Sequence, residues 1–360
     1  MTLKELECSW IDGFPKPMII AGPCSAESEQ QMMETAERIK KNNMGVSVFR
    51  AGIWKPRTKP GSFEGVGAIG LEWLKKVKTE FGFKTATEVA NSYHTSAALD
   101  ADVDVLWIGA RSTVNPFTVQ EIAEALEGTD KIVLVKNPVN PDLSLWVGAF
   151  ERLLAQGIKK LGAIHRGFST YRKTEYRNIP NWQIALDFKN QYPNIPMFVD
   201  PSHICGNRTG LYRVAQEALN LNYEGIMIET HCLPDKAWSD ASQQITPENL
   251  AEIISCLKVR NSNISGYEED LERHRMLISD IDFQIIELLS ERMKISEKIG
   301  SIKQKNNIAI FQPDRWKIIT QYAQMKADET GMNKEFIEKI FKAVHEESVE
   351  VQNKIMTHKP

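Results

Sequence analysis

The sequence predicts an α/β protein, a closed (β/α)8 barrel followed by a smaller all-α helical domain that dimerises. Between Pro17 and about Lys258, short β-rich apolar segments alternate with amphipathic segments, as in repeated strand–helix units. Beyond Tyr267 the strand signals stop and helical periodicity takes over. Polar residues also gather at one end of the predicted strands, the arrangement expected for a barrel with its site at the strand ends.

The predicted strands are bounded by Gly, Pro, Asn or Asp, and each is followed by a helix-like segment. In order they span 17–25, 46–52, 83–89, 104–110, 131–138, 161–167, 196–202 and 225–231. Eight such units in about 240 residues fit a closed barrel. Their near-equal lengths favour it over the main alternative, an open doubly wound sheet.

The segment 261–266, NSNISG, is small and polar and is the predicted linker between domains at 1–260 and 267–360. Three helices are expected after it, ending at about Lys305, running from Pro313 to about Glu329, and starting at Asn333. An apolar stripe follows the first helix: Leu271, Ile278, Ile281, Ile285, Leu288, Ile295, Ile299 and Ile302. Because one helix cannot bury such a stripe alone, it must pack on the other two or on a second chain.

Composition describes a soluble globular chain. Of its 360 residues, 42% are hydrophobic and 25% are charged, and 44 Lys+Arg against 47 Asp+Glu give a net charge of −3. We therefore expect no nucleic-acid partner and no membrane partner. The N-terminus lacks the layout of a signal peptide, and the five cysteines form no CxxC pair, so a cytoplasmic protein with reduced thiols is expected.

Polar residues lie at or just past the last apolar residue of nearly every predicted strand. They are Cys24, Arg50, Glu88, Arg111, Lys136, Arg166, His203 and Glu229. In a barrel these strand ends share one rim, so the side chains should converge.

Four residues of this region have the donor atoms of a divalent transition-metal site. Cys24, His203, Glu229 and Asp240 would supply sulfur, nitrogen and oxygen, a mixture that suits Mn, Fe, Co or Zn. Asp200 and His231 are the alternative ligands, which we expect to contact the ligands rather than the metal.

Cations are the second group at the strand ends: Arg50, Lys55, Arg57, Arg111, Lys136 and Arg166. Beside apolar strand residues, an unpaired charge is costly, so these side chains need an anion. Arginine suits bidentate recognition of phosphate or carboxylate, and six cations imply more than one phosphate.

The motifs AGPCSAES, RAGIWKPRT, IGAR, LVKNP, HRG, VDPSH and MIETH, in this order, resemble those of 3-deoxy-D-arabino-heptulosonate 7-phosphate (DAHP) synthase. The similarity spans nearly all of 17–258 and is greatest to the compact microbial group, type I beta-like. Kdo-8-phosphate synthase is the near competitor. The KPRT form favours DAHP synthase, because the competitor is expected to have Ala-Asn where Arg57 and Thr58 stand.

This resemblance implies condensation of phosphoenolpyruvate with erythrose 4-phosphate, the first step of the shikimate pathway. It assigns Cys24, His203, Glu229 and Asp240 to the metal, and Arg57 with Thr58 to the phosphate of erythrose 4-phosphate. It assigns phosphoenolpyruvate to Arg50, Lys55, Arg111, Lys136 and Arg166. Lys55 is the expected proton donor to the new alkoxide, with Glu88 or a metal-bound water as alternatives.

The segments LERHRMLISDID, LLSERMKISEKIGSIK, PDRW and HEESVEVQ resemble the all-helical chorismate mutase, which converts chorismate to prephenate. The positions that match its ligand-binding residues are Arg275, Arg292, Lys303, Arg315, Ser348 and Gln352. Arginines would bind the two carboxylates, while Lys303 and Gln352 would hydrogen-bond the ether oxygen. Gln312 and Trp316 depart from the acidic residues usual near the substrate hydroxyl.

Arg275 and Arg292 are 17 positions apart, about 25 Å along a helix at roughly 1.5 Å per residue. If they share a site, a second chain must provide Arg275, which predicts a homodimer through the helical domain and leaves a higher homo-oligomer open. Feedback inhibition by prephenate or chorismate is also expected. The alternative left open is a Kdo-8-phosphate synthase-like barrel with a non-catalytic, ligand-sensing and dimerising tail.

Overall fold

The computed structural model describes residues 2–42, 45–55, 61, 63–171, 174–260 and 268–357. The chain divides into two compact units, Met1–Ser262 and Asn263–Pro360. The predicted linker, 261–266, lies outside the described residues.

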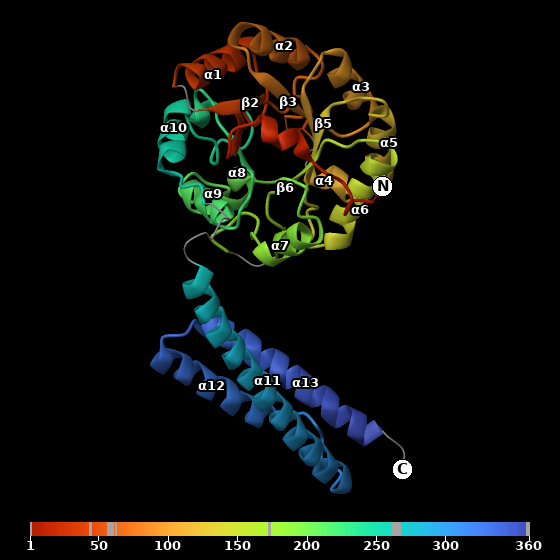
Figure 1. Ribbon diagram of the computed structural model, residues 1–360, viewed down its shortest axis with the longest axis vertical. Coiled ribbons are helices and arrows are strands. Elements are labelled where there is room, and N and C mark those ends of the chain that lie inside the picture. Colours follow the sequence, from red (N-terminus) through yellow and green to blue (C-terminus); the bar gives the residue numbers. More distant parts are fainter. Residues whose placement is uncertain are drawn as a thin grey trace. The chain divides into compact units, whose positions relative to one another are not determined.

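The first unit is the predicted closed barrel of eight parallel strands, paired in chain order with β8 returning to β1 (Figure 1). The strands are β1 (Met18–Gly22), β2 (Val46–Arg50), β3 (Lys84–Val89), β4 (Val105–Ile108), β5 (Ile132–Lys136), β6 (Leu161–His165), β7 (Met197–Val199) and β8 (Gly225–Glu229). Each strand lies within a segment that was predicted as a strand. Because β8 pairs with β1, the sheet is closed, which confirms the prediction of a barrel over an open sheet.

Helices surround the strands, as Figure 1 shows. They are α1 (Glu29–Lys41), α2 (Ile69–Phe81), α3 (Ser92–Asp100), α4 (Ala110–Thr113), α5 (Pro116–Ala125), α6 (Leu143–Ala155), α7 (Trp182–Gln191), α8 (Pro201–Cys205), α9 (Leu211–Asn220) and α10 (Pro247–Cys256), with short 3-10 turns η1 (Ser9–Gly13) and η2 (Pro234–Lys236). Several begin at side chains suited to capping. The Ser28 hydroxyl accepts the amide of Gln31, and Asn115 precedes Pro116 and accepts two amides of α5.

Alternation along the strands separates an inner from an outer apolar cluster. Inner residues include Met18, Ile20, Val48, Ala86, Trp107, Leu134, Ile164, Phe198 and Met227, while their neighbours, such as Ile19 and Phe49, pack outward. Six polar residues each follow an inner apolar residue by two positions: Arg50, Glu88, Lys136, Arg166, Asp200 and Glu229. The two-residue period of a strand therefore directs these polar side chains toward the same mouth.

The opposite end of the barrel is covered by the N-terminal segment. Trp10, in η1, stacks on Phe198 with ring centroids 6.3 Å apart, and its indole N–H donates to the carbonyl of Leu161 at 3.0 Å. Apolar side chains of this segment therefore close the end of the barrel opposite the strand ends.

The second unit consists of α11 (Glu268–Lys305), α12 (Pro313–Thr330) and α13 (Lys334–Thr357), close to the predicted helices. Helix α13 packs along both α11 and α12. At Gly300 an added Cβ would lie 3.2 Å from the Cα of Gln352, so a small residue permits the close approach of α11 and α13. Polar residues, including Ser296, Lys303, Ser348 and Gln352, are buried in this unit.

Much of the predicted apolar stripe on α11 remains uncovered in one chain. Ile278 is 59% exposed, Ile281 55% and Leu288 65%. Among the described helices, none has both the length and the apolar character needed to cross a membrane.

Candidate active sites

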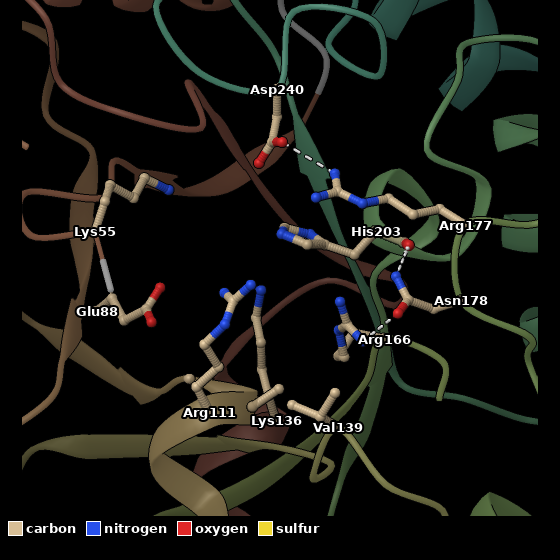
Figure 2. A pocket seen from close by; sticks show the side chains of 12 residues that line it. Lys55, Glu88, Arg111, Lys136, Val139, Arg166, Arg177, Asn178, His203 and Asp240 are labelled. Atoms are coloured by element: carbon tan, nitrogen blue, oxygen red, sulfur yellow. Dashed lines mark hydrogen bonds and ion pairs between the residues drawn. The ribbon is translucent and has the colours of Figure 1, made fainter. Parts of the chain in front are cut away.

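A cavity of about 220 Å³ opens at the mouth of the barrel. Figure 2 shows side chains from several strand ends directed into it. Its charged lining contains five cations and two carboxylates: Lys55, Arg111, Lys136, Arg166 and Arg177 against Glu88 and Asp240. Such an excess of positive charge suits an anion with several charges.

One side of this region has the donors of a metal site. Ligand atoms of Cys24, Glu229 and Asp240 lie within 4.8 Å of one another, with the Cys24 Sγ 3.4 Å from Asp240 Oδ2. His203 is not in this set, although its Nε2 lies 3.8 Å from Glu229 Oε1. Among the described residues that buried oxygen makes no hydrogen bond, and Arg50 Nη1 approaches it only to 3.4 Å. A buried carboxylate oxygen without a hydrogen-bond donor is what we expect if a cation binds between the four predicted ligands.

The groups around Cys24 control whether its thiolate can form. Burial and the nearby Glu229 carboxylate raise the pKa of the Cys24 thiol to about 12. Lys55 donates from Nζ to Cys24 Sγ at 3.1 Å, which places the ammonium beside the candidate metal ligands. The thiolate needed for coordination would therefore form together with cation binding.

Asp200 and His231, the alternative ligands, lie outside the ligand cluster, and only Asp200 contacts a predicted ligand. Asp200 Oδ2 lies 2.8 Å from both His203 Nδ1 and Lys136 Nζ. Burial opposes ionisation, yet His203 and Lys136 hold the pKa of Asp200 well below its usual value. His231 Nε2 lies 3.4 Å from Glu27 Oε2. Neither belongs to the cluster of Cys24, Glu229 and Asp240.

The predicted cations surround the remainder of the cavity. Arg166 donates to Asn178 Oδ1 at 2.8 Å, and burial lowers its pKa to about 10, so an anion would favour its charged form. Lys136 and Arg111 line the same cavity. Arg50 is buried instead, stacked over Trp107 at 4.7 Å, and does not line the cavity. The predicted phosphate-binding residues Arg57 and Thr58 lie outside the described part of the chain.

Glu88, the alternative proton donor, also faces the cavity. Its Oε2 accepts from the indole N–H of Trp107 at 3.1 Å. Gly109 makes room for it, because a Cβ there would lie 2.1 Å from Glu88 Oε1.

Sequence reasoning missed Arg177, Asn178 and Gln243. Arg177 donates to Asp240 Oδ1 at 2.9 Å and to Gln243 Oε1 at 2.8 Å. Gln243 in turn donates to Glu229 Oε2 at 2.6 Å. Arg177 and Asn178 belong to an irregular segment between β6 and α7, where no period indicates direction.

The helical unit contains a second cavity, of about 240 Å³. Its lining includes five predicted residues: Arg292, Lys303, Arg315, Ser348 and Gln352. Arg292 donates to the Ser348 hydroxyl, and Lys303 donates to the carbonyl of Ile310 at 2.6 Å. Burial lowers the pKa of both Arg292 and Lys303, so a bound anion would stabilise their charged forms.

Arg275 does not line this cavity. It is exposed on α11, with Nη1 3.7 Å from Glu272 Oε2. The two unusual residues, Gln312 and Trp316, both line the cavity, and Trp316 stacks on His345 with centroids 4.3 Å apart. Trp316 is therefore part of the pocket wall rather than of an apolar core.

Comparison with protein families identifies two regions. Residues 6–265 match the DAHP synthetase I family, and residues 274–353 match chorismate mutase type II. The phospho-2-dehydro-3-deoxyheptonate aldolase of Thermotoga maritima is 31% identical over 240 residues, covering 67% of this chain and 68% of its own. A 2-dehydro-3-deoxyphosphooctonate aldolase of Helicobacter pylori is 29% identical over 283 residues, covering 69% and 96%.

Solved structures agree with this similarity. The crystal structure of the Thermotoga maritima DAHP synthase matches with a TM-score of 0.60 at 31% identity, over 66% of this chain and 67% of that one. A truncated form of the synthase from the same organism matches with a TM-score of 0.57 at 28% identity, over 66% and 84%. The chain is an enzyme that belongs to the DAHP synthetase I family and contains, after its barrel, a chorismate mutase type II domain.

Proposed function

We propose that the barrel catalyses a metal-dependent condensation of phosphoenolpyruvate with erythrose 4-phosphate, giving DAHP and inorganic phosphate. The main support is the division of the barrel mouth, with candidate metal ligands on one side and cations on the other. A divalent Mn, Fe, Co or Zn ion, held by Cys24, His203, Glu229 and Asp240, would supply Lewis acidity toward the aldehyde oxygen.

The cations have a defined task in this reaction. Arg111, Lys136 and Arg166 would bind the phosphate and carboxylate of phosphoenolpyruvate and hold its C3 toward the aldehyde carbon. The new carbon–carbon bond forms there, water adds at C2, and phosphate leaves from the resulting hemiketal. Arg50 would act from beneath, through Glu229 and the carbonyl of Cys24. Arg57 and Thr58 are proposed for the phosphate of erythrose 4-phosphate.

Lys55 is the proposed proton donor to the new alkoxide. Its ammonium lies 3.1 Å from Cys24 Sγ, on the side where the aldehyde oxygen would bind. Glu88 is a less suitable donor, because its carboxylate already accepts from Trp107.

Phosphate release from phosphoenolpyruvate tests the reaction, with erythrose 4-phosphate or arabinose 5-phosphate as the second substrate. The five-carbon sugar would be preferred by the alternative, a Kdo-8-phosphate synthase-like barrel. We expect release with erythrose 4-phosphate, its loss on chelation, and its recovery with a divalent transition metal. Equal rates before and after complete metal removal would contradict the metal requirement.

We further propose that the helical domain rearranges chorismate to prephenate as a homodimer, with Arg275 supplied by the second copy. The cavity offers Arg292 and Arg315 to the carboxylates, and Lys303 with Gln352 to the ether oxygen. The rearrangement needs no nucleophile, because fixing the folded substrate and stabilising the polar transition state suffice. Disappearance of chorismate absorbance tests it, and a chain without such activity would instead have the ligand-sensing tail of the alternative. We also propose a cytoplasmic enzyme, consistent with five free cysteines.

A further inference from the structure

The segment between β6 and α7 connects the two halves of the barrel site. Arg177 and Asn178 are adjacent in this segment, and both line the cavity (Figure 2). Asn178 accepts from Arg166 on the anion side and donates from Nδ2 to the carbonyl of His203 at 2.7 Å. Arg177 instead contacts one of the candidate metal ligands, Asp240. Neighbouring side chains of one segment thus reach both sets of site residues.

Contacts of Arg177 distinguish the two oxygens of Asp240. Oδ1 accepts from Arg177 Nη1 at 2.9 Å, whereas Oδ2 faces Cys24 Sγ at 3.4 Å. The same Nη1 donates to Gln243 Oε1, and Gln243 Nε2 donates to Glu229 Oε2, which leaves Glu229 Oε1 toward His203. On each carboxylate, one oxygen is held by this chain of hydrogen bonds and the other faces the candidate ligand cluster.

We propose that Arg177, acting through Asp240 and Gln243, is a positioning residue that sets one-oxygen coordination by Asp240 and Glu229. This inference rests on the proposed metal function. Groups that hydrogen-bond to metal ligands fix ligand orientation, and their loss typically weakens metal binding about 10- to 100-fold. Neither Arg177 nor Gln243 is a metal ligand in this arrangement.

The backbone of this segment is itself fixed against α8. Arg177 N–H donates to the carbonyl of Cys205 at 3.3 Å, and Asn178 N–H donates to that of Ile204 at 3.2 Å. Gly206 has a positive φ of 66°, and a Cβ there would lie 2.5 Å from Arg177 Cβ. Close packing therefore holds the arginine at the site before any ligand arrives.

Charge-conserving variants provide the test, because removing a cation beside a divalent ion would also relieve repulsion. Arg177→Lys keeps the charge but replaces the planar guanidinium by a compact ammonium, and Gln243→Met keeps length and neutrality but removes both hydrogen bonds. The measurement is titration of the metal-stripped full chain with Co²⁺, following the absorbance of the cobalt–thiolate bond to Cys24. Cys24→Ser identifies that band by abolishing it.

We expect each variant to weaken Co²⁺ binding by about tenfold or more and to alter the visible ligand-field bands. The double variant should lose less Co²⁺-binding free energy than the sum of the losses in the two single variants, because both residues act through one chain of hydrogen bonds. Arg213→Lys is the matched control, because Arg213 pairs with Glu175 on the surface at 2.8 Å. Its replacement should change neither the Co²⁺ affinity nor the ligand-field bands.

Two outcomes would overturn the inference in different ways. Unchanged affinity and spectrum in Arg177→Lys and Gln243→Met, with normal binding by the unsubstituted protein, would refute the positioning role alone. Absence of a Cys24-dependent band in the unsubstituted protein would refute the proposed metal site itself, and this inference with it. Thermal unfolding of each metal-free variant confirms that a loss of binding does not reflect loss of the fold.

Discussion

At the residue scale, the barrel site depends on charges that are buried in pairs. Lys136 has a side chain only 5% exposed, and its partner Asp200 is fully buried. Replacing Asp200 by Asn would leave the ammonium buried without its counter-charge, which typically destabilises a protein by about 3–5 kcal/mol. We expect that loss in the free energy of unfolding of the barrel, measured by urea denaturation without substrate.

Asp187→Asn is the control for this prediction, because Asp187 accepts from Gln183 on the exposed surface of α7. It should change the free energy of unfolding by no more than about 0.5 kcal/mol. Equal denaturation midpoints for Asp200→Asn and the unsubstituted protein would contradict the dependence of Lys136 on Asp200.

The same scale shows which site residues a sequence can reveal. Arg50 follows Val48 by two positions and Lys136 follows Leu134 by two, so strand alternation alone directs both toward the mouth. Arg177 has no such neighbour. Its direction is set by packing against Gly206 and by hydrogen bonds to Asp240 and Gln243, which are distant in sequence. Tertiary contacts of this kind leave no local pattern.

At the element scale, α10 packs on α1 across the point where the chain closes the barrel. Glu248, in the first turn of α10, accepts from Arg38 Nη2 at 2.5 Å and from Nε at 3.1 Å. Hydrogen bonding to Arg38 is the main reason why the pKa of Glu248 is lowered to about 2. Since the Glu248 side chain is 49% exposed, solvent screening limits the stabilisation to less than about 1 kcal/mol.

A pH dependence follows from this pair. A carboxylate whose pKa is depressed in the folded state stabilises fully above its unfolded value, 4.5, and loses that effect as the pH falls toward about 2. The difference in unfolding free energy between the unsubstituted protein and Glu248→Gln should therefore be constant from pH 7 to 5 and shrink below 4.5. Glu252→Gln, on the same helix, should show no comparable difference. A difference that grows on acidification would refute this assignment.

Helix α11 marks the limit of what periodicity predicts about an element. Its length and its apolar stripe were both predictable, because each follows from spacing along one chain. The sequence does not predict what covers the stripe. In a single chain, residues such as Ile278 and Leu288 remain more than half exposed. Exposed apolar area of this kind favours association, as the proposed homodimer requires.

At the scale of the whole molecule, Arg275 and Arg292 test that association. Only Arg292 lines the helical cavity, so a site that uses both would take Arg275 from a second copy. Chains with Arg275→Ala and chains with Arg292→Ala should each be nearly inactive toward chorismate. Mixing and re-equilibrating them should restore activity, because each mixed dimer regains one intact site. Mixed dimers no more active than either parent would exclude a shared site.

The remaining prediction concerns the covalent union of the two proposed activities. DAHP is not the substrate of the mutase, so linkage alone would transfer nothing directly between the cavities. Coupling gives a physical reason for the union: prephenate or chorismate bound by the helices would shift the barrel toward a less active arrangement. A coupling free energy of about 1–3 kcal/mol changes apparent affinity about 5- to 150-fold.

We therefore expect synthase activity of the full chain to fall as prephenate rises, and that of a chain ending at Arg260 to be unaffected. Because coupling between binding sites is reciprocal, prephenate and phosphoenolpyruvate should each weaken the binding of the other to the full chain by the same factor. Calorimetric titrations with and without phosphoenolpyruvate measure that factor separately from catalysis. An equal response of both chains would mean that prephenate acts on the barrel directly. No response in the full chain would mean that the helices are a tethered second catalyst without regulatory effect.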